Sequence, residues 1–409
     1  MVMTPGSSDQ TFYGLGIAPK ILDIIERMKF KTPTPIQFKA IPIGIQGNDI
    51  IGIAQTGTGK TLAFGIPMIQ RLAQSSALGL ILVPTRELAI QVEEAISKIG
   101  RSFGMNTAVL IGGAPMYHQI NAIRRRPRVI IATPGRLNDH LNQRTVNLSS
   151  VGILVLDEAD RMLDMGFMPQ IEDVLKHLPK ERQTMLFSAT IPEKIIRIAS
   201  TYMKLPVSVE IAKSGTAAEK VTQELFIIKK EDKPALLGKL LEQYHGTVLL
   251  FSRTKRGASR ITRGLLSMGH NAAEIHSDRS LNQRRQALEG FKSGRYRILV
   301  ATDIAARGID VKGIELVINY DLPDDSENYV HRIGRTGRAE HEGRAISFAT
   351  PDQRNEVLGI ERIMRSELPV KKHPEFFAPG FTAPLVRSFQ PRGRLRGGRG
   401  YRFGSRKKR

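Results

Sequence analysis

The sequence predicts an α/β fold of two tandem domains, each a parallel sheet flanked by helices. Short apolar runs alternate with helical patterns in two stretches, about 30–207 and 221–368. That alternation is typical of parallel strands joined by helical crossovers. A small, polar segment without periodicity separates the two stretches, and a chain of 409 residues is long enough for two cores.

Each stretch contains five apolar runs that we expect to be buried strands. The first has DIIGIA, GLILVP, RVIIAT, ILVLDE and TMLFSA, and the second has ELFII, TVLLFS, RILVAT, ELVINY and AISFAT. The predicted organisation is a first domain over 1–208, a linker over 209–220, a second domain over 221–368 and a tail over 369–409. The tail is rich in Pro, Gly and Arg and lacks periodicity, which predicts disorder.

Charge indicates a polyanionic partner. Lys and Arg total 61 against 39 Asp and Glu, a net charge of +22, and residues 387–409 hold ten basic and no acidic residues. Such an excess favours nucleic acid or an acidic membrane as partner.

The chain has no cysteine, which excludes disulfides and thiolate metal sites. We expect a cytoplasmic monomer without a secretory signal or membrane span.

A glycine-rich loop follows the first apolar run and precedes a helical pattern. In that context, backbone N–H groups and a helix start form a cradle for phosphates. The lysine suits the β- and γ-phosphates and the threonine after it suits Mg²⁺. The strict pattern begins with Gly where this chain has Ala54. The predicted ATP-binding residues are Gln55, Thr56, Gly57, Thr58, Gly59, Lys60 and Thr61.

Acidic residues follow the apolar run ILVL. Carboxylates at the end of a buried parallel strand face the crevice where ligands bind in such sheets. Asp157 is placed to hold Mg²⁺, and Glu158 is placed to orient and deprotonate the attacking water. Together with the phosphate loop, they predict hydrolysis of ATP.

These residues resemble the DEAD-box RNA helicases, and the resemblance covers roughly 12–350. It implies two RecA-like domains, RNA as partner and an adenine-recognition segment over 10–38, which includes Phe12. By resemblance, Gln37 hydrogen-bonds the adenine and Phe30 packs on its ring.

The resemblance also assigns contacts with the RNA backbone. Hydroxyls, Arg and helix-start N–H groups suit phosphates, and Gly permits close approach. In the first domain the implied contacts are Pro84, Thr85, Arg86, Gly112, Gly113, Thr133, Pro134, Gly135 and Arg136; in the second they are Arg253, Thr302 and Gly308.

Further motifs imply catalytic and coupling residues. Ser188-Ala189-Thr190 resembles the motif that couples hydrolysis to strand separation, and its hydroxyls are placed to bond Asp160. By resemblance Arg335 and Arg338 act as arginine fingers on the γ-phosphate, Asp310 contacts the ribose or organises the closed site, and His331 links the domains.

The match departs from the family around His276. The family usually has Gly directly after this His and Gln five residues after it, whereas this chain has Ser277 and Leu281. Arg284 and Phe291 keep their places. The RNA contact or local geometry of the second domain is therefore open. The general layout and short basic tail resemble the bacterial RhlE-like branch.

The resemblance implies an RNA-stimulated ATPase that closes around ATP and RNA and separates short duplexes locally. The tail interleaves Arg and Gly with Tyr401 and Phe403, which predicts a sequence-tolerant RNA anchor. Two alternatives stay open: an ATP-gated RNA clamp or chaperone with little unwinding, and a DNA-directed helicase. The pathway and the particular RNA are not encoded in any pattern.

Overall fold

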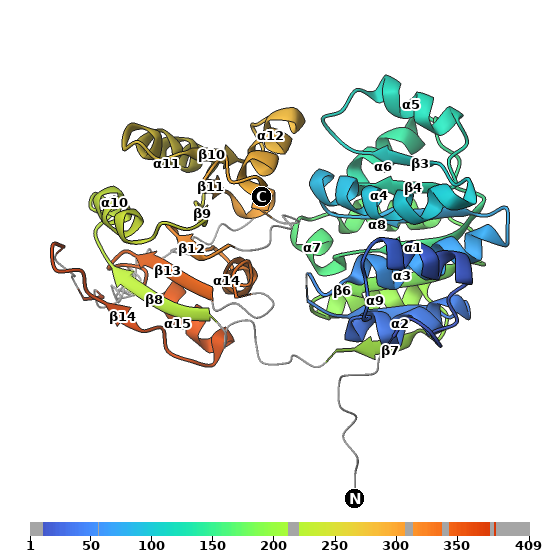
Figure 1. Cartoon of the computed structure of the whole chain (residues 1–409), viewed down its shortest axis with the longest axis horizontal. Helices are drawn as coiled ribbons and strands as arrows, with labels where there is room; N and C mark the ends of the chain where they lie inside the picture. Colours follow the sequence, from blue (N-terminus) through green and yellow to red (C-terminus); the bar gives the residue numbers. More distant parts are fainter. Residues whose placement is uncertain are drawn as a thin grey trace, which may run out of the picture.

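Two α/β domains lie side by side in the computed structural model (Figure 1). The structure describes residues 11–55, 57–211, 221–306, 314–337, 343–376 and 380–381. Within these residues each domain has a seven-stranded sheet, and every paired strand runs parallel to its neighbour. The predicted fold class is therefore confirmed.

The first sheet has the strand order β3-β4-β2-β5-β6-β1-β7. Its strands are β1 (Ile50–Ile53), β2 (Leu78–Leu82), β3 (Thr107–Leu110), β4 (Val129–Ala132), β5 (Val151–Leu156), β6 (Gln183–Ser188) and β7 (Val207–Glu210). The helices of this domain are α1 (Pro19–Arg27), α2 (Pro35–Ile45), α3 (Lys60–Ala73), α4 (Arg86–Gly100), α5 (Met116–Arg124), α6 (Pro134–Asn142), α7 (Ala159–Asp164), α8 (Met168–Lys176) and α9 (Glu193–Tyr202).

The second sheet has the order β10-β11-β9-β12-β13-β8-β14. Its strands are β8 (Val221–Ile227), β9 (Val248–Phe251), β10 (Ala272–Ile275), β11 (Ile298–Ala301), β12 (Leu316–Asn319), β13 (Gly343–Ala349) and β14 (Val370–Lys371). The helices here are α10 (Lys233–Gln243), α11 (Lys255–Ser267), α12 (Leu281–Lys292), α13 (Asp303–Ala306), α14 (Ser326–Ile333) and α15 (Arg354–Met364).

All ten predicted strands are present, and four further strands lie outside the prediction. These are β3, β7, β10 and β14, which occupy the edges of the two sheets. Edge strands bury less surface, so they carry a weaker apolar signal: β3 alternates half-buried and buried residues, and β7 is mostly exposed. The pairing of β14 with β8 extends the second domain beyond its predicted end at residue 368.

Both faces of each sheet are buried. Along β2, Leu80 and Leu82 join a cluster with α6 to α9, whereas Ile81 joins a cluster with α1 to α4 on the opposite face. Strand residues alternate between faces, so continuous apolar runs result when helices cover both. The cluster that packs α1 to α4 against the first sheet is called the α1–α4 cluster below.

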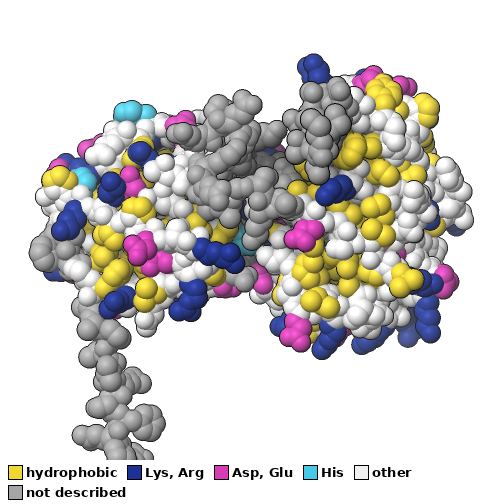
Figure 2. Space-filling model, turned by 90° about the horizontal axis from the view of Figure 1, so that it is seen from below, with side chains coloured by type: hydrophobic (Ala, Val, Ile, Leu, Met, Phe, Trp, Pro, Cys, Tyr) yellow, Lys and Arg dark blue, Asp and Glu magenta, His cyan; other side chains and the backbone are white. Residues whose placement is uncertain are grey.

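The loops at the carboxyl ends of the strands carry most of the predicted site residues. Helices begin directly after these ends: Thr85 caps α4 and Thr254 caps α11 with side-chain hydrogen bonds, and α6 begins with Pro. Helix starts present free N–H groups and a partial positive charge, which suits anions. Figure 2 shows Lys and Arg side chains spread over both domains on one face.

Among the residues that the structure describes, no helix is both long enough and apolar enough to cross a bilayer. The linker residues 212–220 and the tail residues 382–409 lie outside the described parts, as do Thr56, Gly308, Asp310 and Arg338.

Candidate nucleotide and RNA sites

The nucleotide residues gather because their strands are neighbours. The sheet order places β5, β6 and β1 side by side, so the loops after their carboxyl ends meet at one edge. The phosphate loop follows β1, Asp157 and Glu158 follow β5, and Ser188 ends β6. Residues more than 100 positions apart in the chain thus form one site.

The phosphate loop has the conformation that its glycines predict. Gly57 and Gly59 have φ of 85° and 87°, in the left-handed region that disfavours a side chain. Thr58 Oγ1 donates to the carbonyl of Gln55 at 2.7 Å and closes the turn. Lys60 is the first residue of α3, is buried, and donates to the carbonyl of Ala54 at 2.9 Å. Its ammonium therefore lies against the loop backbone.

Gln37 joins the adenine-recognition segment to the phosphate loop. Its Oε1 accepts from the backbone N–H of Thr34 at 2.9 Å, as part of a capping box at the start of α2. Its Nε2 donates to the carbonyl of Gly59 at 3.0 Å. The side chain is 3% exposed, so these bonds fix its position beside the loop.

Phe30 lies beside a cavity of about 430 Å³, which Phe12, Tyr13, Ile25 and Lys31 also line. The Phe30 ring is exposed, whereas Phe12 belongs to the α1–α4 cluster. Phe30 is therefore available to stack on a ring, and Phe12 has a packing role in the segment.

Asp157 and Glu158 are both buried at the edge of β5. Burial raises the pKa of Asp157 to about 7, although the charge of Lys60 acts in the opposite direction. Because nearby positive charge does not offset the burial of this carboxylate, a divalent cation would suit the position. Asp157 Oδ1 also accepts from the backbone N–H of Glu158 at 2.9 Å, which orients the carboxyl group. The donor set of Asp157 with Thr61 thus fits Mg²⁺.

Glu158 is held in a strained and charged state. Its φ of 52° is left-handed, an uncommon conformation for a residue with a side chain, as found at functional sites. Burial acts to raise its pKa, but the nearby charges of Arg161 and Lys60 outweigh burial, and the pKa is lowered. Arg161 Nη1 donates to Glu158 Oε2 at 2.7 Å, and both side chains are buried.

Arg335 is a buried residue of the second domain whose charge acts on Glu158. It lies in the turn after α14, is 4% exposed, and its charge helps to lower the pKa of Glu158 in the first domain. Arg338 and Asp310, which were predicted to act here, lie outside the described residues.

Asp160 connects the acidic loop to the end of β6. Its Oδ2 accepts from the backbone N–H groups of Ala189 and Thr190 at 3.0 and 2.9 Å, and from the Thr190 hydroxyl at 3.1 Å. Its own N–H donates to Ser188 Oγ at 3.2 Å. The predicted contacts of both hydroxyls with Asp160 are present. His331 is half-buried on α14.

The first-domain residues that were predicted to contact RNA form two neighbouring groups. Thr85 Oγ1 accepts from the N–H of Leu88 and caps α4, and the guanidinium of Arg86 lies over Gly112 and Gly113. Gly113 has a φ of 75°, in the left-handed region that favours glycine, and a side chain there would meet this guanidinium. Pro84 precedes the Thr85 cap.

The second group starts α6. Thr133 precedes the helix, Pro134 and Gly135 form its first turn, and Arg136 Nη1 donates to the carbonyl of Ala114 at 2.9 Å. Arg136 therefore ties the start of α6 to the segment that follows Gly113.

A buried amide fixes the glycine pair from behind. Gln119 on α5 exchanges hydrogen bonds with the backbone N–H and carbonyl of Ile111, at 3.0 and 3.1 Å, and also donates to the carbonyl of Ala114. These bonds hold the chain on both sides of Gly112 and Gly113. His140 contacts Gln119 from α6, and burial lowers the pKa of its imidazole.

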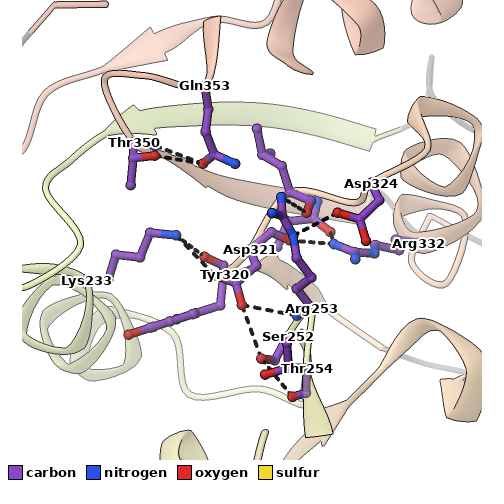
Figure 3. A network of polar contacts seen from close by, with 12 residues as sticks. Lys233, Ser252, Arg253, Thr254, Tyr320, Asp321, Asp324, Arg332, Thr350 and Gln353 are labelled. Atoms are coloured by element: carbon purple, nitrogen blue, oxygen red, sulfur yellow. Dashed lines mark hydrogen bonds and ion pairs between the residues drawn. The ribbon is translucent and has the colours of Figure 1, made fainter. Parts of the chain in front are cut away.

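In the second domain, a network of polar contacts determines how Arg253 lies (Figure 3). The Arg253 side chain donates to the carbonyl of Leu322 at 3.1 Å and pairs with Asp324 at 3.1 Å. Its backbone N–H donates to Asp321, which also accepts from the buried Lys233. The guanidinium thus points toward its own domain, and its RNA contact stays a prediction. Thr302 is half-buried at the end of β11.

Three buried polar residues in and around these sites were not predicted: Arg161, Gln119 and Arg332. Arg332 is 2% exposed and makes a bidentate pair with Asp303. Its guanidinium also donates to the side chain of Asn319 and lies over the ring of Phe251. Arg161 lies three residues after its partner Glu158, a spacing typical of side chains that meet on one helix turn, whereas Gln119 and Arg332 bond to residues outside their own helices. Arg161 therefore had a local signal in the sequence, and the partners of Gln119 and Arg332 depend on the fold.

Family profiles identify both domains. The DEAD/DEAH box helicase profile matches residues 34–198, and the helicase conserved C-terminal domain profile matches residues 232–340. The DEAD-box ATP-dependent RNA helicase CshA of Geobacillus kaustophilus is 44% identical over 367 residues, which span 89% of this chain and 79% of that protein. The chain belongs to the DEAD-box helicase family. CshA of Bacillus subtilis is 41% identical over 89% of the chain and 74% of its own length.

Solved DEAD-box structures share the arrangement of both domains. Dbp5 of S. cerevisiae, bound to RNA and ADP BeF3, is 32% identical with a TM-score of 0.78, covering 88% of this chain and 95% of that one. Mss116, bound to ssRNA and UDP-BeF, is 30% identical with a TM-score of 0.79, covering 88% and 78%. The relatives are named CshA, and the RhlE-like assignment of this DEAD-box helicase stays a prediction.

Proposed function

We propose that this DEAD-box helicase hydrolyses ATP when it binds RNA, and uses the cycle to unwind or remodel short RNA duplexes and RNA–protein complexes. The observation that carries this proposal is that buried Lys60, Asp157 and Glu158 gather at one sheet edge of the first domain, while buried Arg335, whose charge also acts on Glu158, lies in the second domain. The phosphate loop and the acidic pair come from one domain and the arginine from the other. A hydrolytic site divided in this way is complete only when the domains meet.

The residues divide the chemistry among them. Lys60 lies at the start of α3, where it and the loop N–H groups receive the phosphates. Glu158, kept ionised by Arg161, orients and deprotonates the attacking water. Mg²⁺ held by Asp157 and Thr61 would neutralise phosphate charge. Arg335 stabilises the charge that spreads over the transferred phosphoryl group.

Asp160 is proposed to couple the nucleotide to the RNA. Its carboxylate holds the backbone and hydroxyl of Thr190, so a shift of the acidic loop is passed to the segment after β6. His331 and the undescribed Asp310 and Arg338 are proposed to complete the interdomain contacts. Capped helix starts and close glycines support the proposed RNA-backbone contacts of the first domain.

The proposed function is tested by steady-state ATP hydrolysis with no nucleic acid, with single-stranded RNA and with DNA of the same sequence. We expect strong stimulation by RNA and little by DNA, as well as ATP-dependent displacement from a short RNA duplex. Equal stimulation by DNA would favour a DNA-directed helicase. Stimulation and ATP-dependent retention of RNA without displacement would favour the clamp. Hydrolysis indifferent to RNA would contradict the proposal.

The basic tail is proposed as an extra RNA anchor. Residues 387–409 carry ten basic and no acidic residues, and counterions released from RNA make such binding salt-dependent. Deleting them should weaken RNA affinity and flatten its dependence on salt, measured by fluorescence anisotropy over a salt series. Replacing Tyr401 and Phe403 by Leu is the matched control for stacking alone. Unchanged affinity at every salt concentration would contradict the anchor.

A monomer that acts in the cytoplasm is the simplest setting for this activity, and both properties stay predictions.

A further inference from the structure

The first turn of α12 contacts the first domain. Leu281 begins this helix and packs against the α1–α4 cluster of the other domain. Figure 1 shows α12 at the side of the second domain that faces the first. A capping box between Ser280 and Gln283 fixes the helix start, because each side chain bonds the other's backbone N–H. The apolar contact is therefore made from a rigid turn.

A buried ion pair lies on the same face of the helix. Arg284 is three residues after Leu281, a spacing that places two side chains side by side on a helix. Its guanidinium is 2.8 Å from the carboxylate of Glu87 on α4, and the two side chains are 8% and 6% exposed. Burial lowers the pKa of Arg284, and Glu87 acts against that shift. The pair is thus desolvated between the domains.

Arg285, the next residue of α12, and Glu94 on α4 are both exposed. The pKa of Arg285 is raised, first by its hydrogen bond to Glu289 on the same helix and also by the charge of Glu94 on α4. A partly buried apolar contact, a buried ion pair and exposed charges follow one another along the first turns of α12. That order is the usual anatomy of a docking interface.

The energy of this contact depends on the apolar residue. Removing two charges from water costs more than a buried pair commonly returns, so Arg284 and Glu87 specify the alignment of the domains and add little net stability. Leu281 loses water-exposed apolar surface when the domains meet, and this burial is favourable. Leucine also has no group that could hydrogen-bond RNA.

We propose that Leu281 is a positioning residue that docks the second domain on α4 and biases the protein toward its closed arrangement. The contact is immediately next to Arg86, whose charge also acts on Arg284. Docking therefore occurs beside the proposed RNA site and adds to the closure that RNA and ATP drive. This inference rests on the proposed function, since it assumes closure on these two ligands.

The free energy of docking enters the apparent affinity of every ligand that needs the closed state. A ligand that binds only the closed state has an apparent affinity reduced in proportion to the fraction of the protein that is closed. Replacing Leu281 by Gln, the residue that the family usually has there, removes apolar burial from the closed state. The concentrations of RNA and ATP at half-maximal rate should rise about five- to tenfold, with kcat at saturation nearly unchanged.

Closure is measurable without reference to activity. The chain has no cysteine, so Ser75→Cys on the first domain and Ser293→Cys on the second, both exposed, allow specific labelling for energy transfer. Closure is titrated with RNA in the presence of a non-hydrolysable ATP analogue. Leu281→Gln should shift this titration by the same five- to tenfold factor, Leu281→Met should restore it, and Leu266→Gln, at an exposed leucine of α11, should leave it unchanged.

Closure of Leu281→Gln at wild-type concentrations would overturn the docking role. So would a loss that Leu281→Met does not restore, or a lowered kcat with unchanged half-maximal concentrations, because either indicates a change within the second domain. If the wild-type protein itself neither closes nor hydrolyses ATP with RNA, the proposed function fails instead. The midpoint of thermal unfolding is measured for each variant, and an unchanged midpoint shows that the fold is intact.

Discussion

Glu158→Gln should lower RNA-stimulated ATP hydrolysis by about 100-fold or more, with ATP binding retained. The amide keeps the shape of the side chain but accepts no proton from the attacking water. ATP should still bind, because the phosphate loop and Lys60 do not depend on the charge of Glu158 for their conformation. Single-turnover hydrolysis with saturating RNA measures the chemical step, and binding of a fluorescent ATP analogue measures affinity.

The same change leaves Arg161 buried without its anionic partner. We therefore expect a lower thermal midpoint for Glu158→Gln, and activity must be measured well below it. Glu193→Gln, an exposed acid at the start of α9, is the matched control and should retain full activity. Loss of less than tenfold in the chemical step would show that another group activates the water.

Arg335→Ala should reduce the chemical step by about 1,000-fold or more, the range found when an arginine finger is removed. The side chain lies in the second domain but acts on the site of the first. A guanidinium can donate several directed hydrogen bonds to a phosphoryl group where an ammonium cannot, so Arg335→Lys should recover only part of the rate. Hydrolysis at saturating ATP and RNA, compared with Arg362→Ala at an exposed arginine of α15, measures the effect.

Arg335 and Leu281 should have opposite kinetic signatures. Losing Arg335 removes an interaction with the transition state, so kcat falls at saturation. Losing Leu281 changes the population of the closed state, so the half-maximal concentrations rise. If Arg335→Ala only raised the ATP concentration at half-maximal rate, the arginine would bind the ground state and the catalytic proposal would be wrong.

Where the sequence was sufficient, a local pattern determined the structure. The ten predicted strands are apolar because helices cover both faces, and the glycines of the phosphate loop have the positive φ that their positions require. The contacts of Asp160 with Ser188 and Thr190 followed from two recognisable motifs on neighbouring strands. In each case the partners could be named before their distance was known.

Where the sequence was insufficient, the partner came from a distant element. Gln119 is an ordinary helical residue until the fold places the backbone of Ile111 beside it. The departure at Leu281 was visible in the sequence, but its packing against another domain was not. The contacts of Arg253 with Asp324 and Leu322 of its own domain were likewise not visible in the sequence. Such contacts depend on tertiary geometry, which no spacing encodes.

The double attachment of Gln37 bears on efforts to change which base this enzyme accepts. One end of its amide caps α2 through Thr34, and the other reaches the carbonyl of Gly59. A substitution chosen to suit guanine or a pyrimidine would also release the helix start and one carbonyl of the phosphate loop. A change of base selectivity therefore requires a second substitution that supplies a new acceptor for the backbone N–H of Thr34. Replacing Gln37 alone would yield an enzyme that is weaker with every nucleotide.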